Sequence, residues 1–155
     1  MTNKPKVLLV DDEQVFTDNV AKLLLNRGYK VKAVNNGASA IAALEEDDFD
    51  VMVLDLKMPG MDGLTTLKET LKLELRTEVL ILTGHGAVDS AIDALKLGAL
   101  EYMTKPCEID ELVEKIEEAA GKKFKADETE IGRKVKLATE SPWSALSFFG
   151  KKRKS

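Results

Sequence analysis

The stretch Val51-Met-Val-Leu54-Asp55-Leu-Lys-Met-Pro-Gly-Met-Asp-Gly63 joins four apolar residues to one acid and a turn rich in Gly and Pro. A short β-forming run bounded by charged residues is typical of a strand, and a run that is apolar throughout is typical of a central parallel strand covered on both faces. A second run of this kind, Lys6-Val-Leu-Leu-Val10, ends in Asp11-Asp12-Glu13. Both strands are therefore expected to carry acids at their carboxyl ends.

Outward from these two runs, apolar segments alternate with amphipathic ones through residues 1–120. The other expected strands are Lys30–Val34, Val79–Leu82 and Leu100–Met103. Apolar residues recur at helical spacing in five further stretches, at 15–24, 40–44, 64–75, 87–95 and 109–116. This (βα)5 pattern predicts an α/β fold with a doubly wound, five-stranded parallel sheet of the flavodoxin-like kind. Strand order 2-1-3-4-5 is one common solution, and it puts the site at the carboxyl ends of strands 1 and 3.

The composition is that of an ordinary soluble protein. The chain has 155 residues, of which 44% are hydrophobic and 32% are charged, and this excludes collagen-like, low-complexity and disulfide-scaffold classes. One cysteine and one histidine exclude an internal disulfide, a Cys/His zinc site and any mechanism that needs two imidazoles. No signal-peptide pattern is visible, and the apolar runs are too short to span a bilayer. We therefore expect a reducing, cytoplasmic location.

Charge divides the chain into two parts. Residues 1–120 hold 13 Lys/Arg and 23 Asp/Glu, whereas residues 121–155 hold 10 and 4. We place a domain boundary at Gly121, with a basic C-terminal tail over 121–155 that is weakly helical or partly disordered and too short for a second ordinary domain. An acidic body argues against nucleic-acid binding by residues 1–120.

The acids at the ends of the first and third strands predict a metal site. If these strands are neighbours, Asp11, Asp12 and Asp55 converge, and such carboxylates repel one another unless a cation neutralises them. Hard oxygen ligands with room for water suit Mg²⁺. An acidic first helical turn is the alternative explanation for Asp12 and Glu13, but it does not account for Asp55.

Two further polar residues end the remaining central strands. Thr83 follows the fourth strand and Lys105 follows the fifth. Taken singly, Thr83 is explained as a turn or cap residue and Lys105 as a solvated surface lysine. Taken together, a hydroxyl and an ammonium at the mouth of the same sheet could both bind an anionic oxygen held near Asp55.

These residues carry a resemblance to a known family. Val10-Asp-Asp-Glu13, Asp55-Leu-Lys-Met-Pro-Gly-Met-Asp-Gly63, Thr83-Gly84 and Tyr102-Met-Thr-Lys-Pro106 resemble the receiver domain of bacterial two-component response regulators, over residues 4–120. The resemblance implies a phosphorylation-activated switch, rather than an enzyme, that accepts a phosphoryl group on Asp55 from the phosphohistidine of a histidine kinase or phosphotransfer protein. It also implies that Asp12, Asp55 and the backbone carbonyl of Lys57 ligate Mg²⁺ directly, and that Asp11 assists through bound water.

The same resemblance assigns roles to the other residues at the strand ends. Thr83 and Lys105 would contact the phosphoryl oxygens, and Tyr102 would be the switch aromatic. Lys57 and His85 would tune the lifetime of the phosphoryl group. A cis peptide bond before Pro106 would aim Lys105. The downstream protein target would bind the face made by strand 4, helix 4 and strand 5.

Two rival classes share parts of this pattern. A haloacid-dehalogenase-like phosphatase also uses an aspartate, Mg²⁺ and a lysine, but it needs a second aspartate at the position that Lys57 occupies. A flavodoxin-like electron carrier needs a hydroxyl-rich phosphate loop where this chain has Asp11-Asp12-Glu13, which would repel the phosphate. Both rivals thus lack a group that their chemistry requires.

The output of the switch has two open alternatives. Thr83-Gly-His-Gly86 resembles the same stretch in receivers that are linked to ATPase domains, so the chain could be a fragment of a longer transcriptional regulator. The basic end Phe148–Lys154 instead favours a stand-alone single-domain response regulator. The tail itself is either an inert end, a segment that docks on acidic helices or an acidic partner, or a contact to an anionic membrane through Trp143, Phe148 and Phe149.

Overall fold

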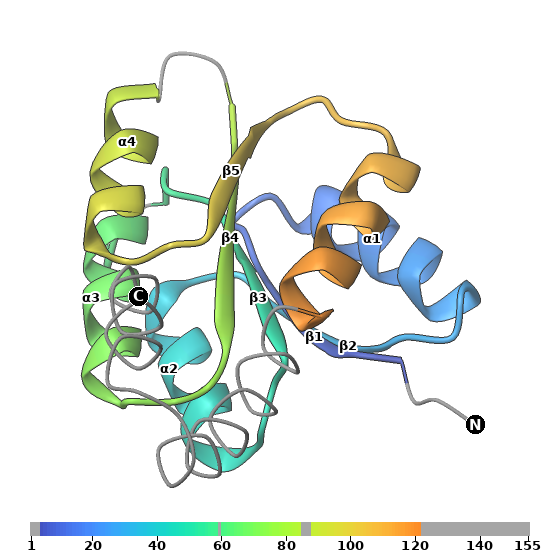
Figure 1. Ribbon diagram of the computed structural model, residues 1–155, viewed down its shortest axis with the longest axis horizontal. Helices are drawn as coiled ribbons and strands as arrows, with labels where there is room; N and C mark the ends of the chain where they lie inside the picture. The colour runs from blue at the N-terminus through green and yellow to red at the C-terminus, as the bar shows by residue number, and fades with distance from the viewer. Residues whose placement is uncertain (1–3, 59, 85–87, 122–155) are drawn as a thin grey trace, which may run out of the picture.

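The computed structural model describes residues 4–58, 60–84 and 88–121. The tail beyond residue 121, with its boundary and its alternative roles, lies outside the described residues, and so does His85. Five strands form one parallel sheet in the order β2-β1-β3-β4-β5 (Figure 1). They are β1 (Lys6–Val10), β2 (Lys30–Val34), β3 (Val51–Leu54), β4 (Glu78–Thr83) and β5 (Glu101–Thr104). The predicted doubly wound α/β fold and its strand order are confirmed.

Helices cover both faces of the sheet. They are α1 (Gln14–Asn26), α2 (Gly37–Glu46), α3 (Gly63–Lys72), α4 (Val88–Leu97) and a further helix over residues 109–121. Figure 1 shows α2, α3 and α4 on one face, and α1 with helix 109–121 on the other. Among the described residues no helix combines the length and apolar character needed to cross a bilayer.

Each face of the sheet has its own apolar core. Leu8, Met52 and Leu54 point toward α2, α3 and α4, whereas Leu9, Val53 and Leu82 point toward α1 and helix 109–121. Because β1, β3 and β4 contribute to both cores, their side chains are buried nearly throughout. By contrast β2, an edge strand as the sequence indicated, is mostly exposed.

The register aligns the strand ends that carry the candidate site. Val10 pairs with Leu54 in the β1–β3 ladder, so Asp11 and Asp55 leave the sheet side by side. The Asp55 amide extends this ladder by donating to the Val10 carbonyl at 2.9 Å, and the Asp11 amide donates to Val34 of β2 at 3.2 Å. Backbone hydrogen bonds thus hold both acids at the carboxyl edge of the sheet.

Some expected helix positions differ from the structure. In α1 the buried residues are Thr17, Val20 and Leu24, whereas Val15 and Leu23 are 75% and 44% exposed. The spacing of three and four residues from 17 to 24 defines one stripe, and Val15 and Leu23 lie off it. Leu75 lies outside α3, because that helix ends at Lys72 and Glu74 adopts a positive φ of 54°.

Candidate functional site

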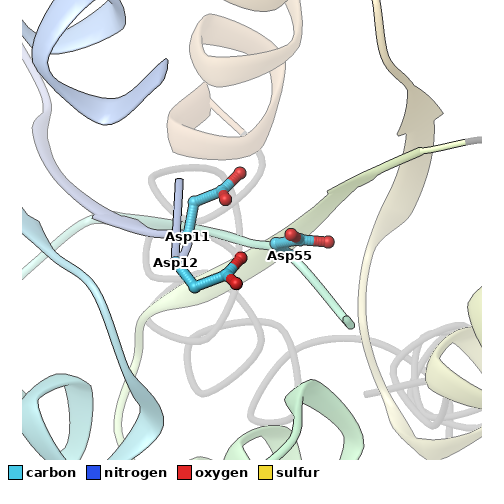
Figure 2. A group of neighbouring side chains, drawn as sticks. All are labelled: Asp11, Asp12 and Asp55. Carbon is cyan, nitrogen blue, oxygen red and sulfur yellow. The ribbon is translucent and has the colours of Figure 1, made fainter. Parts of the chain in front are cut away.

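Three aspartates meet at the carboxyl edge of the sheet. One carboxylate oxygen from each of Asp11, Asp12 and Asp55 lies within 4.8 Å of the other two, and Figure 2 shows the carboxylates of Asp11 and Asp12 on the side that faces Asp55. Asp11 and Asp55 are 3% and 5% exposed, whereas Asp12 is exposed. Burial raises the pKa of Asp11, and the nearby charge of Asp55 adds to the rise, although hydrogen bonds from Lys105 and the Glu13 amide oppose it. The cluster therefore has the hard oxygen donors and the local charge that a divalent cation requires.

Thr83 reaches the same cluster from the end of β4. Its hydroxyl donates a hydrogen bond of 2.8 Å to Oδ1 of Asp55, and both side chains are buried. The backbone amide of Lys57 donates to the same oxygen at 3.2 Å. Oδ1 therefore has two donors, while Oδ2 faces the ammonium group of Lys105 at 3.7 Å.

Lys105 lies closer to two other acids than to Asp55. Its Nζ is 2.5 Å from Asp11 Oδ2 and 2.8 Å from Glu13 Oε1. Burial lowers the pKa of Lys105, but the hydrogen bonds to Asp11 and Glu13 and the charges of Asp55 and Asp11 outweigh it, so the pKa is raised. The ammonium group is therefore cationic and partly offsets the charge of the cluster.

Phe16 packs against the same lysine. The Lys105 Nζ lies 4.3 Å from the centre of the Phe16 ring, within the range of a cation–π contact. The peptide bond between Lys105 and Pro106 is cis, the isomer that the resemblance implied. The lysine is thus held by three carboxylates and one aromatic face.

A second layer of contacts fixes the backbone under the acids. Asn35, just after β2, donates from Nδ2 to the Asp11 carbonyl at 2.8 Å and to the Thr17 hydroxyl at 3.2 Å. The Glu13 amide donates to Asp11 Oδ1 at 3.0 Å. No sequence pattern indicates the roles of Asn35 and Phe16, since an Asn in a turn and a Phe in a helix have many ordinary explanations.

Close packing defines the loop after Asp55. A Cβ atom on Gly63 would lie 2.3 Å from Leu56 Cα and 2.6 Å from the Asp55 carbonyl oxygen, so only glycine fits there. At Gly60 the backbone φ is 76°, a conformation that glycine adopts far more readily than other residues. Among the described residues, nothing lies within 4 Å of a Cβ atom built on Gly84. Asp62 caps α3 by accepting a 2.8 Å hydrogen bond from the Thr65 amide.

Tyr102 lies on β5, next to β4. It pairs with Ile81, and Thr83 lies two residues further along β4, so the side chains of all three leave the same face of the sheet. Tyr102 is half-buried and packs against the core on the α4 side. The structure thus brings together Asp11, Asp12, Asp55, Thr83 and Lys105, with the Lys57 backbone beside them and Tyr102 nearby.

This combination defines a doubly wound α/β domain with a cluster of three aspartates at its carboxyl edge. The family model for the response regulator receiver domain matches residues 7–117, and the chain belongs to that family. Receiver domains are phosphoacceptor switches that bind Mg²⁺ at an acidic pocket and interact with histidine kinases and output domains.

Individual relatives agree with this assignment. The chain is 40% identical over 113 residues to the transcriptional regulatory protein ZraR of Klebsiella oxytoca, covering 73% of this chain and 26% of that protein. It is 36% identical over 119 residues to FixJ of Bradyrhizobium diazoefficiens, covering 77% and 58%. The chain therefore spans about a quarter of ZraR and just over half of FixJ.

Solved structures give the same result. A response regulator receiver domain protein from Clostridium thermocellum is 36% identical, with a TM-score of 0.73 and coverage of 77% of this chain and 96% of that one. NtrX from Brucella abortus in complex with ADP is 29% identical, with a TM-score of 0.78 and coverage of 82% and 29%. The fold and the family are therefore the same by sequence and by structure.

Proposed function

We propose that Asp55 is the phosphoacceptor of this receiver domain, and that a histidine kinase or phosphotransfer protein is the donor. The observation that carries the proposal is the position of the Asp55 carboxylate. It is buried at the end of β3 and contacts both Thr83 and Lys105, at 2.8 and 3.7 Å. Asp11 and Asp12 stand opposite. A carboxylate is a weak nucleophile, so this surrounding charge and positioning supply what phosphoryl transfer needs.

The transfer step exchanges one bond to phosphorus for another. A carboxylate oxygen of Asp55 attacks phosphorus, the bond to the imidazole nitrogen of the donor breaks, and its electron pair remains on that nitrogen. The ammonium of Lys105 and the hydroxyl of Thr83 donate hydrogen bonds to the phosphoryl oxygens. Attack of water on phosphorus later returns the carboxylate and releases inorganic phosphate.

Asp12, Asp55 and the Lys57 backbone carbonyl are the proposed direct ligands of Mg²⁺, with Asp11 acting through water. The donor set fits this ion, because the carboxylate oxygens lie within one ion's reach of each other and are of the hard type. When bound, Mg²⁺ would neutralise charge on the phosphoryl oxygens during transfer. We also propose that the side chains of Lys57 and His85, two residues after Asp55 and Thr83, tune the lifetime of the phosphoryl group.

Tyr102 is the proposed link from the site to the output surface. Thr83 is drawn toward a phosphoryl oxygen, and the Tyr102 ring moves into the space that Thr83 leaves, because both side chains lie on one face of neighbouring strands. The target surface would be the face of β4, α4 and β5. On α4, the side chains of Val88, Ile92 and Leu97 are 38–44% exposed, which suits a protein partner.

We propose two alternatives for the whole protein to which this domain belongs. A stand-alone switch in the cytoplasm that signals by protein contact is one. A receiver segment of a longer transcriptional regulator is the other, and the similarity to ZraR and FixJ, both named as transcriptional regulatory proteins, favours it. A magnesium-dependent phosphatase is less suitable, because Lys57 stands where its general acid would be.

The test is phosphorylation by a small phosphodonor with Mg²⁺, followed by intact mass. One phosphoryl group should be added to the native chain and none to Asp55→Asn. Asp62→Asn is a matched control, since Asp62 is a carboxylate of the same loop whose amide replacement keeps the helix cap. Unchanged labelling of Asp55→Asn would contradict the assignment.

A further inference from the structure

A groove opens at the end of the sheet opposite to the Asp55 site. It has a volume of about 360 Å³ and is lined by three leucines and four acids, which are Leu44, Leu73, Leu75, Glu45, Glu46, Asp47 and Asp48. The acids follow one another at the end of α2, and Leu73 and Leu75 follow α3. The groove therefore has apolar walls from two helix ends and a continuous acidic rim.

Most of the acidic charge in the groove is uncompensated within the described residues. Asp47 pairs with Lys6. Glu45, Glu46 and Asp48 are exposed and form no ion pair with a described side chain. Leu75 is 40% exposed beside them. A complementary occupant would bring several positive charges next to an apolar group.

One segment of this chain has that composition. Phe148-Phe149-Gly150 is followed by Lys151-Lys152-Arg153-Lys154, so two aromatic rings stand beside four consecutive cations. Residues 1–120 have the opposite balance, with 13 basic and 23 acidic groups. The match is therefore one of both charge and apolar character.

The path of the chain makes this match geometrically accessible. Helix 109–121 follows the carboxyl end of β5 and returns along the sheet, so the end of this helix lies toward the amino ends of the strands (Figure 1). The ends of α2 and α3 lead into β3 and β4 and lie at that same end. Between Gly121 and Phe148 there are 26 residues, and a flexible chain of that length has a root-mean-square span of about 28 Å. That span is comparable to the width of a domain of this size.

We propose that the segment 148–154 docks in this groove, with its aromatic rings on the leucines and its cations along the acidic rim. Exposed charge pairs contribute little one by one. Tethering raises the local concentration of the segment to roughly millimolar, so a weak contact is enough to populate the docked state. The contact should weaken with salt, because the charges are exposed.

The experiment places a nitroxide spin label at the end of the full chain, on Ser155→Cys in a Cys107→Ser background, and records amide signals of the ¹⁵N-labelled protein. The expected result is a selective loss of signal intensity for residues 44–48 and 73–75. The intensity should return in about 1 M NaCl, where the Debye length is ~3 Å. It should also return in the triple variant Glu45→Lys, Glu46→Lys, Asp48→Lys.

A matched control changes the same number of charges elsewhere. Asp18, Asp89 and Asp93 are exposed acids of α1 and α4, and replacing all three by Lys should leave the loss at the groove intact. A second variant replaces Lys151, Lys152, Arg153 and Lys154 by Glu. In the otherwise native chain, this change should abolish the loss of amide signal intensity at the groove. In the groove triple variant, it should bring that loss of intensity back. This reciprocal rescue distinguishes docking from a change in folding.

Three results would overturn the proposal. The first is full intensity at the groove in the labelled native chain, and the second is equal loss over α1 and α4. The third is loss in a ¹⁵N chain without a label when it is mixed with labelled ¹⁴N chain, because that assigns the contact to a second copy. Phosphorylation by a small phosphodonor should be unchanged in the groove variant, since the groove is at the far end of the sheet from Asp55.

Discussion

The Thr83 hydroxyl donates a hydrogen bond of 2.8 Å to Oδ1 of Asp55, and both groups are buried. Before phosphorylation, this bond satisfies one acceptor oxygen and holds Thr83 at the end of β4. Addition of a phosphoryl group to Asp55 offers the hydroxyl a new, more highly charged acceptor. A ligand shifts an equilibrium only through such differential contacts, so under the proposed function Thr83 is the residue through which phosphorylation of Asp55 would bias the position of Tyr102.

Replacing Thr83 separates phosphorylation from switching. In Thr83→Ala, we expect phosphorylation of Asp55 by a small phosphodonor to continue, because the carboxylate and its neighbouring acids remain. The change in the NMR signals of the Tyr102 ring on phosphorylation should be lost. Thr83→Ser keeps the hydroxyl and should restore it. Full Tyr102 response in Thr83→Ala would show that the hydroxyl is not the link.

Lys105 should stabilise the metal-free fold. In Lys105→Ala the buried Asp11 loses its closest cationic partner and faces Asp55 unpaired, and breaking a buried pair of this kind costs about 3 kcal/mol. Added Mg²⁺ should recover much of the loss, since a cation then neutralises the carboxylates. Urea unfolding with and without Mg²⁺ measures both effects. Lys115→Ala, which removes a surface pair with Glu101, should change stability far less.

Asp12 should matter for Mg²⁺ and little for the metal-free fold. Its side chain is exposed and makes no hydrogen bond to a described residue, so Asp12→Asn should unfold at nearly the native urea concentration without metal. At 100 times the dissociation constant, Mg²⁺ stabilises a one-site protein by about 2.7 kcal/mol, and most of this gain should be absent in the variant. Asp18→Asn on α1 is the control. If Mg²⁺ stabilises Asp12→Asn as much as the native chain, Asp12 is not a ligand of the ion.

Replacement by alanine should destabilise the protein at Gly63 but not at Gly84. Gly63→Ala forces a methyl group against the backbone of Leu56 and the Asp55 carbonyl. Overpacking of this kind lowers the free energy of unfolding by about 1–3 kcal/mol. In Gly84→Ala the added methyl group meets no described residue within 4 Å, so this variant should leave stability unchanged. Thermal unfolding of the two variants checks the contrast, and a stable Gly63→Ala protein would show that the loop can move away from Asp55.

The fold could be predicted because strand and helix signals agreed with each other along the chain. Val7 to Val10 and Val51 to Leu54 are apolar throughout, and in the structure both runs are buried by helices on two faces. Once their strands are neighbours, the convergence of Asp11 and Asp55 follows from the parallel register alone. The main elements of the site therefore depend on local patterns that a reader of the sequence can see.

Other features depend on long-range packing and carry no local pattern. Phe16 contacts Lys105 across 89 positions of sequence, and Asn35 holds the Asp11 carbonyl from a separate βα unit. The buried stripe of α1 also differs from the apolar spacing over residues 15–24, because it includes Thr17, whose hydroxyl donates to the Gln14 carbonyl and accepts from Asn35. A hydroxyl that is satisfied inside the protein behaves as a core residue, and periodicity of apolar residues alone does not identify it.

The cap of α3 supplies a prediction with a defined pH dependence. The backbone hydrogen bond from Thr65 to Asp62 lowers the pKa of this carboxyl below its usual value. The charged form is therefore favoured by folding, so its contribution is complete above the ordinary aspartate pKa of about 4 and is lost as the pH falls through the lower, folded value. At pH 7, Asp62→Ala should reduce the free energy of unfolding by about 1 kcal/mol.

The difference between the native chain and Asp62→Ala should shrink as the pH is lowered from about 5 toward 3, because the protonated carboxyl no longer favours the folded state. Asp62→Asn keeps a neutral acceptor for the Thr65 amide, so it should retain most of the stability at pH 7 and differ from Asp62→Ala by a constant amount over the same range. Urea unfolding at each pH gives the three curves. A gap between native and Asp62→Ala that stays constant down to pH 3 would mean that the charge on Asp62 contributes nothing and that the cap acts through the hydrogen bond alone.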